Sequence, residues 1–124
     1  MTHGAGFLKL VNEAKERVEQ IDIDDYRSMR ESGEAHLLVD TREDSEWAAG
    51  HVAGAVHIGK GVIERDIEGA YPDLQAELVL YCGGGFRSAL TCDAAQKMGY
   101  RNVHSLIGGY KGLVAAGWPM KSGE

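Results

Sequence analysis

One cysteine of this chain stands where a reactive side chain would be expected. Cys82 ends the apolar run "LVLYC", which reads as a buried strand. The residues that follow it combine glycines with an aromatic, a cationic and a hydroxyl side chain: Gly83, Gly84, Gly85, Phe86, Arg87 and Ser88. Ligands of parallel sheets collect where a strand leads into a helix. The spacing therefore predicts nucleophilic attack by Cys82 on an electrophilic atom carried by an anion.

The loop composition supports a thiolate at this position. Glycines 83–85 permit backbone angles that let amide N–H groups turn inward as an anion site. The positive end of the following helix and the cation of Arg87 both favour thiolate over thiol, so no histidine base is required. A tight strand-to-helix turn around an unreactive cysteine is the alternative. For Cys92, on the apolar stripe of a predicted helix, the pattern favours packing.

The elements that would position Cys82 alternate along the chain. Short apolar runs predict buried strands at 36–40, 54–58, 77–82 and 102–106. Helical spacing and end signals predict an amphipathic helix through Val18, helices near 22–33, 42–50, 87–99 and 109–118, and a loop with one short helix at 60–74. Asp22 or Asp24 is expected to cap the second of these helices.

This alternation predicts an α/β fold with a central, mostly parallel sheet flanked by helices on both faces. The chain contains no internal repeat and no linker-like tract. We therefore expect a single domain over residues 1–124, with residues 1–19 as an additional amino-terminal helix and 20–120 as the core.

Charge and composition argue against several classes of binding partner and cofactor. The net charge of −6 argues against nucleic acid and anionic membranes, since both reward positive charge. No apolar run reaches the length of a membrane-spanning helix, and the amino terminus lacks the pattern of a secretory signal, so we expect a cytoplasmic protein. The two cysteines form no CxxC or Cys/His cluster, so no metal site is predicted.

The sequence resembles the single-domain rhodaneses, a family of sulfurtransferases. Three segments carry the likeness and cover residues 20 to about 120: "LLVDTREDSEWAAGHVAGAVHI", "VLYCGGGFRSALTCDAAQKMGYRNVHSLIGGY" and "GGYKGLVAAGWPM". The resemblance implies that Cys82 takes the sulfane sulfur of thiosulfate or a persulfide and passes it, as a Cys82 persulfide, to a thiol or cyanide. It also implies a rhodanese-like fold and no metal or organic cofactor. A protein as sulfur donor or acceptor is a further expectation.

The resemblance extends to charged residues around the loop. Asp40 and Arg42 match the Asp-x-Arg of the family, and we expect them to provide structural support by pairing with each other or holding a neighbouring loop. Arg87 could face the substrate anion or turn back to a carboxylate such as Asp40 or Glu64. The second arrangement is favoured, because backbone amides already supply contacts to an anion.

One position departs from the family pattern. Many rhodaneses carry a cationic or bulky residue directly after the cysteine, whereas this chain has Gly83. The missing cation predicts modest affinity for thiosulfate and favours a persulfide donor. Phe86 either forms an apolar rim for such a donor or packs on the edge of the sheet.

Two other functions remain open on the sequence. Dual-specificity phosphatases and some arsenate reductases are similar but carry Cys-x5-Arg, whereas Cys82 and Arg87 enclose only four residues. The shorter loop suits one sulfur atom better than a tetrahedral oxyanion, and no general acid is apparent in it. A non-catalytic module that binds a protein is the second alternative. The sequence leaves open the physiological donor and acceptor, the pathway and the oligomeric state.

Overall fold

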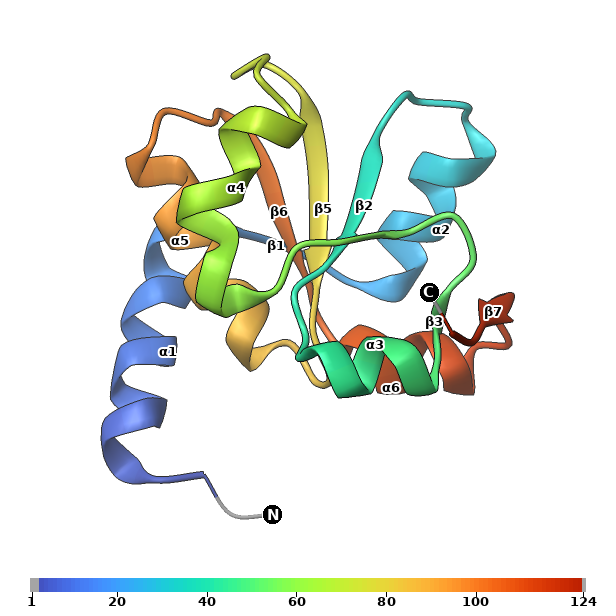
Figure 1. Cartoon of the computed structure of the whole chain (residues 1–124), viewed down its shortest axis with the longest axis horizontal. Helices are drawn as coiled ribbons and strands as arrows, with labels where there is room; N and C mark the ends of the chain where they lie inside the picture. The colour runs from blue at the N-terminus through green and yellow to red at the C-terminus, as the bar shows by residue number, and fades with distance from the viewer. Residues whose placement is uncertain (1–2, 124) are drawn as a thin grey trace.

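A parallel sheet forms the centre of the molecule (Figure 1). The structure is a computed structural model that describes residues 3–123. Within these residues the sheet has five strands in the spatial order β1 (Glu19–Ile21), β6 (Asn102–Leu106), β5 (Glu77–Tyr81), β2 (Leu37–Asp40) and β4 (Val56–His57). Every neighbouring pair is parallel, so the predicted α/β class with its parallel sheet is confirmed. β5, the strand before Cys82, is the middle strand.

Helices cover both faces of the sheet, as the sequence predicted (Figure 1). One hydrophobic core joins the sheet to α1 (Ala5–Arg17), α4 (Ile63–Ala70) and α5 (Phe86–Lys97). A second core joins the other face to α2 (Ile23–Glu31) and α6 (Gly109–Ala115). The remaining elements are α3 (Asp44–Ala49), the short 3-10 helix η1 (Lys60–Val62) and an antiparallel pair, β3 (His51–Val52) and β7 (Met120–Lys121). No helix among the described residues has the length and apolar character needed to cross a bilayer.

Local sequence explains how α2 and α5 begin. The Asp22 carboxylate accepts from the amide of Asp25, whose own side chain accepts from the Asp22 amide, so Asp22 rather than Asp24 is the cap. α5 begins after Gly85, whose φ of 99° lies in the left-handed region. Small residues such as Ala89 and Cys92 let α5 pack closely between the sheet and α1.

Several short elements differ from the prediction. β1 follows α1 almost directly and takes residues that the sequence assigned to the end of the first helix and the approach to the second. β3 and β7, of two residues each, were not predicted. These strands are too short for an alternating pattern, and they are fixed by backbone pairing with distant segments.

Candidate functional site

Cys82 lies at the carboxyl end of the middle strand, where the sequence placed it. The amide N–H of Gly85 donates to the Cys82 Sγ across 3.1 Å. This is the one backbone amide among residues 83–88 that hydrogen-bonds the sulfur in the described structure, although the sequence predicted that several would converge. The left-handed φ of Gly85 turns its N–H inward, which explains why glycine is suited to this position.

The amino-terminal turn of α6 holds the loop through its backbone. The Tyr110 amide donates to the Cys82 carbonyl at 2.7 Å, and the Lys111 amide donates to the Gly83 carbonyl at 3.1 Å. These bonds fix the direction of both carbonyls. Gly109 allows the close approach, because a Cβ there would lie 2.3 Å from the Cys82 carbonyl oxygen. The "GGY" motif was noted in the sequence, but its contact with the loop was not predicted.

A buried hydroxyl group lies beside the sulfur, and a second one contacts the first. The Ser88 Oγ is 3.7 Å from the Cys82 Sγ and 2.8 Å from the Ser105 Oγ. Ser88 and Ser105 are both almost fully buried. The sequence singled out Ser88 but missed Ser105, which comes from β6 and shows no motif of its own. Together they form a short polar chain that leads to the sulfur through otherwise apolar packing.

Arg87 binds a carboxylate, but not one of the two that the sequence suggested, and its guanidinium stays beside the loop, where a Cβ at Gly83 would lie 3.0 Å from Nη2. Its Nη1 and Nη2 donate to the Oε1 and Oε2 of Glu46 at 2.7 and 3.1 Å. The prediction that Asp40 or Glu64 would be the partner is wrong. Asp40 is already occupied by Arg42, whereas Glu46 projects from α3, a short helix whose position relative to Cys82 could not be read from the sequence. The bidentate pair ties α3 to the start of α5.

The pair predicts a distinct acid sensitivity. The hydrogen bonds from Arg87 lower the pKa of Glu46 from 4.5 to about 2. Because the pKa of Glu46 is lower in the folded than in the unfolded state, the ionised carboxylate stabilises the fold. This contribution is complete above pH 4.5 and is lost as the pH falls towards 2. We therefore expect the difference in free energy of unfolding between wild type and Glu46→Gln to shrink between pH 5 and pH 2. Urea unfolding at fixed pH values measures it.

The matched control is Glu16→Gln, which removes an exposed carboxylate that forms no ion pair within residues 3–123. The difference in free energy of unfolding between wild type and Glu16→Gln should vary much less between pH 5 and pH 2. A Glu46→Gln difference that stays constant from pH 5 to pH 2 would contradict the role given to this ion pair.

Asp40 and Arg42 form a buried pair close to the site. The Arg42 Nη2 donates to the Asp40 Oδ2 at 2.8 Å and to the Gly50 carbonyl at 2.6 Å. The Arg42 guanidinium also lies 4.0 Å from the centre of the Tyr110 ring. Arg42 thus connects the end of β2, the end of α3 and the turn of α6 that holds the loop, an arrangement suited to structural support.

A pocket opens above Cys82. Its volume is about 540 Å³, and the residues that line it are His3, Phe7, Glu46, Cys82, Gly83, Gly84, Phe86, Arg87 and Lys111. Phe86 therefore lies on the pocket wall, one of the two placements left open by the sequence. His3 and Phe7 were not predicted as site residues, because helical periodicity does not reveal which element the first helix meets. Cys82 itself is only 1% exposed, so a reactant would have to enter through this pocket.

The other described cysteine has a different environment. Cys92 is fully buried in the core beneath α5, as its apolar stripe predicted. Burial raises the pKa of the Cys92 thiol. Cys92 is therefore poorly suited to form a thiolate.

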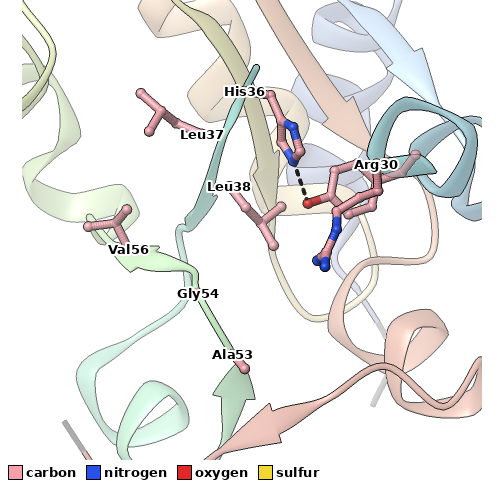
Figure 2. Close-up of a pocket in the computed structure, with 8 residues that line it drawn as sticks. Arg30, His36, Leu37, Leu38, Ala53, Gly54 and Val56 are labelled. Atoms are coloured by element: carbon pink, nitrogen blue, oxygen red, sulfur yellow. Dashed lines mark hydrogen bonds between the residues drawn. The ribbon is translucent and has the colours of Figure 1, made fainter. Parts of the chain in front are cut away.

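A smaller cavity of about 160 Å³ lies elsewhere, beside the start of β2 (Figure 2). His36 and Tyr26 meet there, with 2.8 Å between the His36 Nε2 and the Tyr26 hydroxyl. Arg30, Leu37 and Leu38 also line it. No cysteine is among the residues that line it. No group of three or more His, Cys, Asp or Glu residues within 3–123 is placed to hold a metal ion.

Comparison with solved structures identifies a close match in shape. The structure of protein RPA3614 from Rhodopseudomonas palustris superposes on this one with a TM-score of 0.84 and 28% sequence identity. The alignment covers 98% of this chain and 98% of that protein. That protein is described as one of unknown function and a possible tyrosine phosphatase.

Comparison of sequences identifies sulfurtransferases. GlpE of Pseudomonas entomophila, a thiosulfate sulfurtransferase, is 33% identical over 78 residues, which are 63% of this chain and 70% of that protein. Rhodanese-like domain-containing protein 8, chloroplastic, of Arabidopsis thaliana is 25% identical over 111 residues, 79% of this chain; the chain spans only 25% of that protein. Residues 22–116 match the profile of the rhodanese-like domain. The chain therefore belongs to the rhodanese-like domain family, and within it resembles sulfurtransferases.

Proposed function

We propose that the protein is a sulfurtransferase that carries sulfur as a persulfide on Cys82. The observation that supports this most strongly is the geometry of the sulfur: the Gly85 N–H donates to the Sγ at the floor of an open pocket. A fixed amide dipole aimed at the sulfur stabilises negative charge there without any rearrangement.

The reaction runs in two displacements. The Cys82 thiolate attacks the sulfane sulfur of thiosulfate, the sulfur–sulfur bond of the donor breaks, and sulfite leaves with its electron pair. Cys82 then carries a persulfide. An acceptor such as cyanide attacks the terminal sulfur, forms thiocyanate and returns the bonding electrons to the Cys82 thiolate. The electrons balance between donor and acceptor, so no external oxidant or reductant is needed, and the protein supplies the nucleophile and the charge stabilisation.

A phosphatase on the same scaffold is the second candidate, favoured by the resemblance to a possible tyrosine phosphatase. Two observations weigh against it. The Arg87 guanidinium lines the pocket, but its Nη1 and Nη2 both donate to Glu46, which competes with a phosphoryl group for these donors. Glu46, the one carboxylate that lines the pocket among the described residues, has a pKa of about 2 and is ionised near neutral pH, so it could not protonate a leaving group.

Steady-state kinetics distinguish the two functions. With thiosulfate and cyanide as substrates, we expect thiocyanate formation with parallel double-reciprocal lines, the signature of a covalent intermediate between two half-reactions. With an aryl phosphate, we expect no release of phosphate above the rate of the Cys82→Ser variant. Phosphate release that depends on Cys82, without thiocyanate formation, would overturn the sulfurtransferase proposal in favour of the phosphatase.

A further inference from the structure

The first helix contributes a wall to the pocket above Cys82, although it lies outside residues 22–116, the part that matches the family profile. α1 is held firmly against α5. The Arg17 Nε and Nη2 donate to the two carboxylate oxygens of Asp93 at 2.9 and 2.8 Å, and Val11 and Ala14 are fully buried between the two helices and the sheet. These contacts fix α1 against α5, and Phe7 in the first turn of α1 lines the pocket.

Three rings form this wall. The centre of the His3 ring lies 4.6 Å from that of Phe86 and 5.2 Å from that of Phe7. The Phe7 and Phe86 rings are 6.4 Å apart. All three residues line the pocket, and all three distances are in the range of favourable aromatic contacts. His3, Phe7 and Phe86, here named the aromatic wall, offer an apolar surface to a molecule in the pocket.

The pocket is larger than a small inorganic anion requires. Its volume of about 540 Å³ falls in the range of about 300–1,000 Å³ typical of sites for organic ligands. Thiosulfate has no apolar part that could use the aromatic wall. A donor with an organic group could fill the space and gain binding energy from it.

Charge at the pocket favours an anionic donor. Lys111 lines the pocket and is exposed, and the Lys15 Nζ lies 4.8 Å from the centre of the Phe86 ring. Within residues 3–123 neither lysine forms an ion pair. Glu46, the carboxylate at the pocket, is neutralised by Arg87. Lys111 is therefore a cation without an ion-pair partner among the described residues, and it could bind a carboxylate of a molecule in the pocket.

We propose that Phe7 of α1 is a specificity residue and that the aromatic wall it forms with His3 and Phe86 selects the persulfide of a low-molecular-weight thiol over thiosulfate, while Lys111 binds a carboxylate of that thiol. This inference rests on the proposed sulfurtransferase function. The Cys82 thiolate attacks the terminal sulfur of the donor R–S–SH, the sulfur–sulfur bond breaks, and R–S⁻ leaves with the electron pair. Cys82 keeps the terminal sulfur with its proton, so the exchange is balanced and needs no oxidant.

The test compares kcat/KM for glutathione persulfide and for thiosulfate, each with cyanide as acceptor. We expect the ratio of the two values, glutathione persulfide over thiosulfate, to fall about tenfold in Phe7→Ala, because the organic donor alone loses apolar contact. Leu10→Ala is the matched control, since Leu10 lies on the same helix, is 57% exposed and does not line the pocket. Its ratio should equal that of the wild type.

Phe7 also packs against the core, so Phe7→Ala could lose activity because it folds poorly. A second variant at an exposed position of the wall avoids this problem. His3→Ala removes an exposed ring of the same wall and should lower the ratio by about threefold. A ratio that is unchanged in both variants, while the wild type turns over both donors, would overturn this inference and leave the sulfurtransferase function standing. A wild type that accepts sulfur from neither donor would overturn the proposed function itself.

Discussion

Replacing Cys82 by serine should reduce the rate of sulfur transfer by about 10⁴-fold or more, the scale of loss seen when a covalent nucleophile is removed. Serine fits the space but cannot form a persulfide, and its hydroxyl is rarely ionised near neutral pH. The Gly85 amide and the α6 contacts would remain in place, so the variant should fold normally. Thiocyanate formation from thiosulfate and cyanide measures the effect, with thermal unfolding as the check on folding.

The control for this prediction is the other cysteine. Cys92→Ala removes a buried sulfur that does not line the pocket and should leave turnover within about twofold of wild type. If Cys92→Ala lost turnover while Cys82→Ser kept it, the assignment of the nucleophile would be wrong.

Gly109→Ala should have the second largest effect. The new Cβ would lie 2.3 Å from the Cys82 carbonyl oxygen and 3.0 Å from the Gly83 carbonyl carbon, and the φ of 52° disfavours a side chain. Relief of this clash must separate α6 from the loop and break the hydrogen bond from the Tyr110 amide. We expect a loss of about 3 kcal/mol in the free energy of unfolding and at least about 100-fold in kcat/KM.

Gly61→Ala is the matched control, since a Cβ there would meet nothing within 4 Å and its φ lies outside the left-handed region. It should be close to wild type in both measurements. A Gly109→Ala variant with wild-type stability and turnover would show that the contact between α6 and the loop does not hold the site in position.

The sequence was sufficient to predict the elements that carry a strong local signal. The buried runs before Asp40 and Cys82 gave two central strands, because fully buried parallel strands are continuously apolar. Cys82 itself could be placed because the end of a strand followed by glycines has a recognisable pattern. β1 and the pair β3–β7 were missed because two or three residues contain no period.

The contacts that complete the site could not be predicted, for a different reason. Glu46, Ser105 and Phe7 reach Cys82 or its pocket from α3, β6 and α1, which are far from the loop in sequence. Only the packing of these elements decides which side chains meet. Arg87 shows this: its turn towards a carboxylate was expected, but the carboxylate was chosen by the position of α3.

The central claim is that Cys82 carries the transferred sulfur, and intact-mass spectrometry tests it most directly. After incubation with thiosulfate, or with glutathione persulfide, and removal of the donor, the wild type should gain about 32 Da, the mass of one sulfur atom bound as a persulfide. Cyanide should remove this mass, and Cys82→Ser should never acquire it. A wild type that stays at its original mass with both donors, or a gain that persists in Cys82→Ser, would contradict the claim.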